Sequence, residues 1–458
     1  MSEPLGDLTT LAAAMGARIA SKNGALTVAG VATDSRAMHA GDLFIALRGP
    51  NFDGHEFVAD ALQRGAVAAV VEHVPAGLTM PAPLVQVDDT RRALGRLAAA
   101  HRRRFTIPVI AVTGSVGKTS TKELLAAILE TQGATLKTPA NYNNEIGVPL
   151  ALLQLRRVHR FAALELAMRG PGQIAELTAI AAPTVGVITN IGPSHSEFFH
   201  SEEEIARAKG ELLAGMAAGG VAVLNADDRW FALLRGLARG PVVRFGIEHD
   251  AEVRAADLKL SPTQSVWRLM TPDGSAPVTL PLAGRHQVLN ALAAAAAAGA
   301  VGVSVGAVAA ALSNARAMKR RLVFTPAARG FTILDDTYNA SPASVSAALA
   351  VLAAQGGRKF AVLGEMKELG ARTRVLHEET GRAAGELPLE LLVTVGPDAA
   401  ALGRAAAERL GADRWRAVAD ATEVAPILLP LLRRGDVVLV KGSRVLALER
   451  AVEALRDA

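Results

Sequence analysis

Nearly continuous apolar runs alternate with helical stretches along most of this chain. From about residue 107 the runs are "IPVIAVTG", "FAALELAM", "TVGVITNIG" and "GVAVLNADD", each followed by a loop or by helical periodicity. Runs without polar alternation are typical of strands that are buried on both faces of a largely parallel sheet. A second alternation, after residue 318, has the runs "FTILDD", "KFAVLG", "ELLVTVG" and "DVVLVKG". It again predicts a doubly wound α/β unit.

The first 105 residues have a different pattern. Short strand-like runs such as "DLFIAL" and "AVAAVVE" lie between turns that are rich in Gly, Pro and Asp. A chain of 458 residues is also too long for one hydrophobic core. We therefore predict three α/β domains: a small N-terminal α/β domain over 1–106, a central P-loop ATPase-like domain with a mostly parallel sheet over 107–315, and a C-terminal Rossmann-like doubly wound domain over 316–458.

The composition excludes several kinds of site. The chain has no cysteine, which excludes disulfides, zinc–thiolate sites and thiol nucleophiles. A net charge of +5 is compatible with an anionic small substrate or with nucleic acid. The densest basic run, "HRRRF" (101–105), lacks interleaved aromatic residues and is typical of a solvated face or a domain junction. We therefore expect no nucleic-acid partner.

The apolar segments also bear on location. The N-terminus has acidic and polar residues where a secretory signal has positive charge and an apolar run, so we expect a cytoplasmic protein. The stretch 290–312 has the length of a membrane span, but it is mostly Ala and Gly and is interrupted by "GVSVG". Transfer of such a segment from water into lipid is only weakly favourable in free energy. It predicts two packed helices and no membrane insertion.

The segment "VIAVTGSVGKTSTKELLAAILE" (109–130) joins a strand to a helix through a short glycine loop. The Walker A pattern would require glycine at position 112, where the chain has Val112. Gly114 and Gly117 nevertheless permit the backbone angles with which successive N–H groups surround phosphate at a helix N-terminus. Lys118 could reach the terminal phosphates of a nucleotide, and Thr119 could ligate Mg²⁺. The alternative, an ordinary glycine turn before a helix, fits this context less well.

Two polar residues follow strands that we expect beside this loop. Glu165 lies late in "FAALELAM", and His195 comes shortly after "TVGVITNIG". Ligands of open α/β sheets bind beyond the carboxyl ends of the strands, so both side chains could join Thr119 in holding one or two divalent ions. Taken singly, Glu165 could equally form an ordinary ion pair, and a loop histidine is more often structural. Lys209 lies on a helix of mixed charge, where the pattern does not distinguish it from a solvated lysine.

Several longer motifs resemble a known family. They are "TDSRAMHAGDLFIALRGPNFDGHEFVADALQRGA" (33–66), "TPANYNNEIGVPLALL" (138–153), "ITNIGPSHSEFF", "LDDTYNASPASV" (334–345), "LGEMKELG" (363–370) and "VLVKGSR" (438–444). With the short G-x-x-G-K-T loop, they resemble the bacterial Mur ligases over the whole chain. The "DDTYNASP" loop is similar to that of members which join D-alanyl-D-alanine to UDP-N-acetylmuramoyl-tripeptide.

The resemblance implies an ATP-dependent amide ligase with Mg²⁺ (one or two ions). ATP would phosphorylate a peptide carboxylate, and the amine of the dipeptide would attack the resulting acyl phosphate. The N-terminal domain would bind the UDP-sugar, the central domain ATP, and the C-terminal domain the dipeptide while completing the ATP site. We also expect a monomer, and domain closure about hinges near 106 and 316.

The resemblance further implies a role for each matching residue. The expected catalytic residues are Lys118, His195, Lys209, Arg321 and Asp336. The expected ATP contacts are Gly114, Ser115, Val116, Gly117, Lys118, Thr119, Ser120, Asn290, Arg321 and Asp336. The expected substrate contacts are Ser35 and Arg36 for the uridine diphosphate, Asn143 and Asn144 for the sugar-peptide, and Asn339 for the dipeptide. The expected magnesium ligands are Thr119, Glu165, His195 and Lys209, the last as a carbamylated lysine.

Some features depart from the family pattern or leave alternatives open. Gln287, Ala167 and Ser341 replace residues that are usually Asn, Gly and Asn, and "SHSEFFHS" is also unusual. Asp34 and Arg36 could form only a surface pair, and the Asn-rich stretch 141–144 could be only a turn. Three other functions were considered. A MurE-like ligase is not supported, because no D-N-P-R motif is found, and the "TDSR" domain argues against a folylpolyglutamate synthase. A GTPase switch is not supported either, because no N-K-x-D motif is found.

Overall fold

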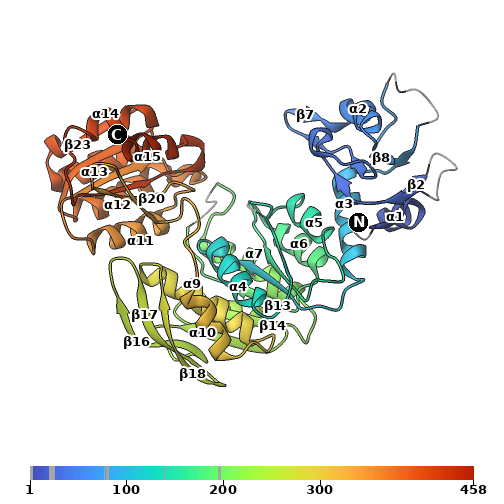
Figure 1. Ribbon diagram of the computed structural model, residues 1–458, viewed down its shortest axis with the longest axis horizontal. Coiled ribbons are helices and arrows are strands. Elements are labelled where there is room, and N and C mark those ends of the chain that lie inside the picture. Colours follow the sequence, from blue (N-terminus) through green and yellow to red (C-terminus); the bar gives the residue numbers. More distant parts are fainter. Residues whose placement is uncertain (1–3, 20–25, 77, 79–81, 140, 194–196) are drawn as a thin grey trace.

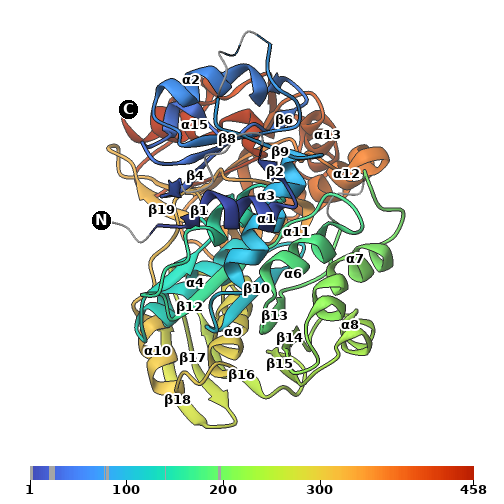
Figure 2. The ribbon, with the colours of Figure 1, turned by 90° about the vertical axis from the view of Figure 1, so that its right-hand side faces the viewer.

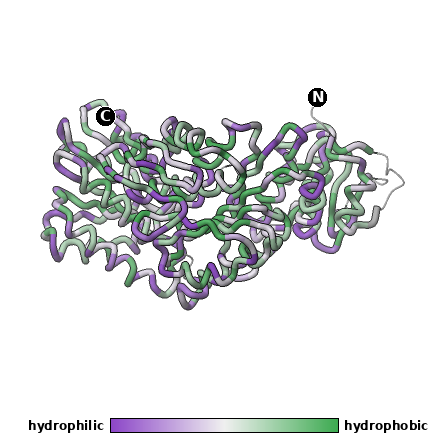
Figure 3. The backbone as a smooth tube through the Cα atoms, turned by 90° about the horizontal axis from the view of Figure 1, so that it is seen from below, coloured by the Kyte–Doolittle hydropathy of each residue, from purple (hydrophilic) through white to green (hydrophobic). Residues whose placement is uncertain are grey.

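The computed structural model describes the chain except residues 1–3, 20–25, 77, 79–81, 140 and 194–196. Three lobes follow one another along the chain and form an open crescent, with the central lobe at its base (Figure 1). Each lobe contains its own main sheet. The apolar segments of the chain run through the interior of the lobes, as the hydropathy colouring shows (Figure 3). The predicted α/β class with a mostly parallel central sheet is confirmed.

The N-terminal lobe is small. Its main sheet has the order β2 (Arg18–Ile19), β9 (Leu84–Gln86), β8 (Ala68–Val71), β5 (Leu43–Ile45) and β4 (Val31–Ala32). Two strand pairs flank it: β1 (Gly6–Asp7) with β3 (Thr27–Val28), and β6 (Arg48–Gly49) with β7 (Phe52–Asp53). Its helices are α1 (Leu8–Met15), α2 (Val58–Gln63) and α3 (Thr90–Arg102). Helix α3 also packs against the central lobe, so that one apolar core continues from the first lobe into the second (Figure 2).

The central lobe has a long sheet. Its order is β11 (Thr135–Lys137), β12 (Phe161–Glu165), β10 (Val109–Thr113), β13 (Val185–Ile188), β14 (Val221–Asn225), β15 (Val242–Gly246), β16 (Val253–Leu260), β17 (Ser265–Thr271) and β18 (Gly274–Leu280). The strands are parallel from β11 to β16, and the meander β16–β18 is antiparallel. The sequence analysis did not predict this meander, whose strands alternate polar and apolar residues and project from the base of the molecule (Figure 1).

Helices cover both faces of this sheet. One face packs on α4 (Lys118–Glu130), α9 (Arg285–Gly299) and α10 (Val305–Ser313). The other packs on α5 (Gly147–Leu152), α6 (Gln173–Ala181), α7 (Glu202–Gly215) and α8 (Phe231–Leu237). The alanine-rich stretch forms α9 and α10, as predicted, and small side chains let α9 lie close against α4. Within the described residues, no helix combines the length and apolarity that a membrane crossing requires.

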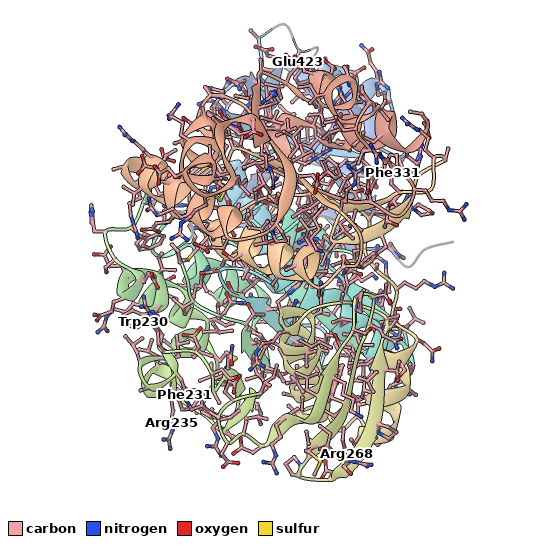
Figure 4. The ribbon with its side chains drawn as sticks, turned by 90° about the vertical axis from the view of Figure 1, so that its left-hand side faces the viewer. Trp230, Phe231, Arg235, Arg268, Phe331 and Glu423 are labelled. Atoms are coloured by element: carbon pink, nitrogen blue, oxygen red, sulfur yellow. The ribbon has the colours of Figure 1, made fainter. Side chains whose placement is uncertain are left out.

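The C-terminal lobe is doubly wound. Its sheet order is β19 (Val323–Pro326), β20 (Thr332–Asp336), β24 (Val437–Lys441), β21 (Lys359–Gly364), β22 (Leu389–Val395) and β23 (Trp415–Val418), parallel except for β19. One face packs on α11 (Pro342–Ala353), α12 (Thr373–Gly385) and α13 (Ala399–Leu410). The other packs on α14 (Val424–Leu428) and α15 (Glu449–Arg456). Figure 4 shows this lobe, with Phe331, above the meander that carries Arg268 and the outer helix α8 with Arg235.

Candidate active site

The glycine loop between β10 and α4 has the conformation of a phosphate cradle. Gly114 has φ 147° and Gly117 has φ 84°. A Cβ on Gly114 would lie 1.9 Å from Thr189 Oγ1, and one on Gly117 would lie 2.2 Å from Asn290 Oδ1, so both positions require glycine. The Asn190 side chain fixes the loop, because its Oδ1 accepts from the Val116 N–H at 3.1 Å and its Nδ2 donates to the Val116 carbonyl at 2.9 Å.

Lys118 is folded back into this loop. Its ammonium donates to the carbonyls of Gly114 at 2.8 Å and Ser115 at 3.2 Å. Burial lowers the pKa of Lys118, and the nearby carboxylate of Glu165 partly opposes this shift. The cation therefore lies among the loop amides, where a nucleotide phosphate would neutralise it.

The carboxyl ends of three neighbouring strands bring the predicted polar groups together. In the parallel register Val112 on β10 pairs with Glu165 on β12. The Glu165 backbone N–H donates to Thr138 Oγ1 at 3.0 Å, and its Oε1 accepts from Asn143 Nδ2 at 2.8 Å. Its side chain is buried, and Oε2 has no hydrogen-bond partner among the residues that the structure describes. A buried carboxylate oxygen without a partner is costly unless a ligand satisfies it.

The groups around this oxygen fit magnesium in part. Carboxylate and hydroxyl oxygens are the ligands that Mg²⁺ prefers, and Thr119 and Glu165 line the same cavity. His195 lies outside the described residues. Among the residues that are described, no group of three His, Cys, Asp or Glu side chains is placed to hold a metal ion.

Lys209 lies on α7 with only 1% of its surface exposed, which corrects the view of a solvated lysine. Burial lowers its pKa well below the usual range, and the charge of Lys118 lowers it further. In the described part of the chain no hydrogen bond or ion pair to its ammonium is found. Burial therefore favours the neutral form of this amine, which is the form that can react as a nucleophile.

The cavity of about 780 Å³ lies between the central and C-terminal lobes. Predicted residues from both lobes line it together: Ser115, Val116, Gly117, Lys118, Thr119, Ser120, Asn143, Asn144, Glu165, Asn290, Arg321, Asp336 and Asn339. Gly114 and Lys209 do not line the cavity, although both lie close to Lys118.

Arg321 connects the two sides of this cavity. Its guanidinium donates to Thr119 Oγ1 at 3.0 Å and lies 4.1 Å above the Tyr338 ring. Its neighbours Arg320 and Leu322 have φ 62° and 54°, which is rare for residues with side chains. Such strain persists only where surrounding contacts impose it, and it is common at functional sites.

Comparisons with known proteins find relatives that cover most of the chain. Family models match for the Mur ligase family, catalytic domain, over residues 27–102, the Mur ligase middle domain over 112–298, and the Mur ligase, glutamate ligase domain over 320–444. The UDP-N-acetylmuramoyl-tripeptide–D-alanyl-D-alanine ligase of Escherichia coli (strain K12) is 37% identical over 436 residues, 94% of each chain. The chain belongs to the Mur ligase family.

Solved structures of Mur ligases share the fold. A crystal structure of MurF from Acinetobacter baumannii has a TM-score of 0.92 at 37% identity and covers 99% of each chain. The MurF ligase from Thermotoga maritima in complex with ADP has a TM-score of 0.83 at 30% identity, covering 93% of this chain and 97% of that chain.

The structure shows the contacts of Gln287 and Ser341, two positions at which this Mur ligase departs from the family pattern. Asn290 is held against the P-loop helix: its Oδ1 accepts from Thr121 Oγ1 at 3.4 Å, and its Nδ2 donates to Gln287 Oε1 at 3.3 Å. Gln287 therefore orients the amide that meets Gly117. Ser341 begins α11 with a capping box, in which Ser344 Oγ accepts from the Ser341 N–H at 2.9 Å.

Other predicted substrate residues have structural partners too. Asn144 Oδ1 accepts from the Gly147 N–H at 2.9 Å, as in the turn that we weighed as an alternative. In the N-terminal lobe Arg36 forms an exposed ion pair with Asp34 at 2.7 Å, which is the surface pair that we weighed as an alternative. Ser35 is buried beside it. Ser35 and Arg36 do not line the cavity between the central and C-terminal lobes.

The sequence analysis missed Lys441, which lines the Mur ligase cavity from the C-terminal lobe. Its ammonium is 2.6 Å from Asp336 Oδ2 and donates to the Asn339 carbonyl at 2.9 Å. Burial raises the pKa of Asp336, and Lys441 opposes this shift. His286 and Glu368 also line the cavity. The motif "VLVKGSR" was the available signal for Lys441, but no local pattern shows its partners.

Proposed function

We propose that this Mur ligase joins D-alanyl-D-alanine to UDP-N-acetylmuramoyl-tripeptide with cleavage of ATP, in peptidoglycan precursor synthesis in the cytoplasm. The observation that carries the proposal is the cavity in which the phosphate cradle faces Arg321, Asp336 and Asn339 of the C-terminal lobe. Relatives with this printed name are 34–40% identical over more than 90% of this chain. We propose that the protein acts as a monomer.

The first half of the reaction uses the central lobe. The loop from Gly114 to Ser120 and Lys118 bind the phosphates of ATP. A carboxylate oxygen of the tripeptide attacks the terminal phosphorus, and the bond from that phosphorus to ADP breaks. Because carboxylate and triphosphate repel each other, Lys118 and Arg321 neutralise the charge between them. Asn143 and Asn144 orient the sugar-peptide through their amides.

The second half uses both lobes. The dipeptide amine attacks the acyl carbon, loses a proton, and the tetrahedral intermediate expels phosphate. We propose that Asn339 and its loop place the dipeptide, that Asp336 and Asn290 hold the nucleoside, and that the N-terminal domain (1–106), through Ser35 and Arg36, holds the uridine diphosphate. Central (107–315) and C-terminal (316–458) domains then enclose the reacting groups, and alignment of three substrates supplies much of the catalysis.

Magnesium fits the same site. Thr119, Glu165, His195 and Lys209 would hold one or two ions, which would supply positive charge beside the terminal phosphate when bound. Glu165 Oε2, which has no hydrogen-bond partner within the described part of the chain, supports this assignment.

Lys209 would ligate magnesium as a carbamate, formed when its amine adds to carbon dioxide. The burial of this amine and its lowered pKa support this step, because only the neutral form of an amine is nucleophilic. We expect ¹³C-bicarbonate to give a carbamate carbon resonance that is lost in Lys209→Met. If the wild-type protein shows no carbamate resonance at neutral pH, the modification is contradicted, but the proposed ligase activity is not.

The test of the proposed function is phosphate release from ATP with UDP-N-acetylmuramoyl-tripeptide, with and without D-alanyl-D-alanine, alongside detection of the amide product. We expect sustained release and amide formation to require both substrates. Vigorous hydrolysis without either substrate would instead indicate a nucleotide switch.

A further inference from the structure

Lys122 is a charged side chain that the reaction above does not use. It lies one helical turn after Lys118 on α4 and has no exposed surface. Lysine is rarely buried completely, because removing an ammonium from water costs several kcal/mol unless partners compensate. A buried cation so close to a phosphate cradle therefore calls for a specific set of partners.

The partners of Lys122 lie beside the proposed metal site. Its ammonium donates to the Thr138 carbonyl at 2.6 Å and pairs with Glu123 Oε1 at 2.7 Å. The other oxygen of Glu123 pairs with Lys137 at 2.7 Å. Glu123 can therefore keep one cation if the other is removed, which leaves the Thr138 contact as the distinctive feature of Lys122.

Thr138 in turn forms hydrogen bonds with β12, the strand that carries Glu165. Its Oγ1 accepts from the Glu165 N–H at 3.0 Å, and its own N–H donates to the Ala163 carbonyl at 3.2 Å. Glu165 Oε1 then accepts from Asn143 at 2.8 Å. Thr138 thus links the P-loop helix by hydrogen bonds to Glu165, whose Oε2 has no hydrogen-bond partner among the described residues.

We propose that Lys122 is a positioning residue that holds Glu165 and Asn143 in register with the P-loop helix through the Thr138 carbonyl. Helix α4 carries Lys118 and Thr119 at its first turn, so a single rigid element then sets the distance between the phosphate cradle and the carboxylate. Groups that orient a metal ligand typically affect metal affinity about 10–100-fold. The proposal rests on the proposed function for its effect on turnover, but not for its effect on metal binding.

The test compares Lys122→Met with Lys137→Met. Both variants remove one cation from Glu123, but only the first removes the donor to Thr138. Mn²⁺ binding to each protein with AMPPCP is measured by electron paramagnetic resonance, and AMPPCP binding without metal by calorimetry. We expect Lys122→Met to weaken Mn²⁺ binding about ten-fold or more, with AMPPCP binding retained and a higher KM for the sugar-peptide. Lys137→Met should leave all three unchanged.

Thr138→Val provides a second variant, because it keeps the carbonyl and removes only the hydroxyl that accepts from Glu165. If Lys122→Met does not fold, as judged by circular dichroism, Thr138→Val decides, and we expect the same loss of Mn²⁺ binding. Unchanged Mn²⁺ binding in the folded variants, equal losses in Lys137→Met, or no Mn²⁺ binding by the wild type would overturn the proposal. A wild-type protein that binds Mn²⁺ normally but fails to ligate the dipeptide would overturn the proposed function alone.

Discussion

Individual charges in the cavity are held by contacts that a nucleotide would replace. Lys118 donates to two loop carbonyls, and Arg321 donates to the Thr119 hydroxyl in the first turn of α4. These contacts keep cations in place before phosphate arrives, which reduces the reorganisation that binding requires. The effects of changing single residues follow from which of these contacts each one makes.

Lys118→Ala removes the cation that would meet the terminal phosphates. Because its contacts lie within the loop and not in an apolar core, we expect the fold to persist while the rate of ligation falls about 100-fold or more. Circular dichroism and the coupled phosphate assay measure the two effects. Near-normal turnover would refute the assigned role.

His286 should make stability depend on pH. Burial lowers its pKa from 6.5 to about 4, and Lys441 contributes to the shift. Below pH 6.5 the unfolded chain binds a proton that the folded chain does not, so stability present above pH 6.5 is lost progressively as the pH falls towards about 4. We expect the melting temperature of His286→Gln to fall less steeply over this interval than that of the wild type. The exposed His39, changed to Gln, serves as the control, and identical slopes for all three proteins would contradict the prediction.

At the scale of elements, the strand–loop–helix unit depends on glycine for its shape. β10 and α4 are ordinary buried elements, and the loop between them fits against Thr189 and Asn290 with no room for a side chain. The missing first glycine of the Walker A pattern lies inside β10, where Val112 is fully buried in the sheet. The shorter motif therefore retains the cradle and adds to the core.

Gly117→Ala should distort this loop. Its φ of 84° and the 2.2 Å approach to Asn290 Oδ1 predict a loss of about 1–3 kcal/mol in the free energy of unfolding, together with weaker AMPPCP binding. Gly236→Ala is the matched control, because this helical glycine on α8 has no neighbouring atom within 4 Å of an added Cβ. We expect the control to stabilise the protein by about 0.5–1 kcal/mol. Urea unfolding and calorimetry measure both effects, and equal behaviour of the two variants would argue against a constrained loop.

At the scale of the whole molecule, the active site is divided between lobes. The N-terminal and central lobes share a continuous apolar core through α3, whereas the C-terminal lobe meets the central one across the cavity. The connection from α10 to β19, residues 314–322, contains no helix or strand. We therefore expect ligand-dependent movement mainly of the C-terminal lobe.

Arg321→Met tests whether the contact across the cavity supports closure. We expect AMPPCP with UDP-N-acetylmuramoyl-tripeptide to reduce the radius of gyration of the wild type in small-angle X-ray scattering, and this reduction to be smaller in the variant. Ligation should fall about 10-fold or more, because the guanidinium donates to Thr119 and stacks on Tyr338. The neighbouring Arg316→Met should behave as the wild type. Full compaction of Arg321→Met would assign closure to other contacts.

The sequence by itself determined the features that depend on neighbours along the chain. Buried strands such as β10 and β24 follow from continuous apolar runs, and the phosphate cradle follows from glycines between a strand and a helix. The family resemblance also pointed to Arg321, Asp336 and Asn339. The antiparallel meander β16–β18 was missed, because its alternation is interrupted by a register shift between Ala256 and Lys259.

Only the tertiary structure decided which of these groups meet. Arg321 and Thr119 are 202 residues apart and touch because two lobes pack across one cavity. The roles assigned to Lys441 and Lys122 depend on their contacts with residues of other elements. No spacing along the chain specifies those contacts. Periodicity records whether a side chain faces the core, but the partner of a buried charge depends on how separate elements are packed.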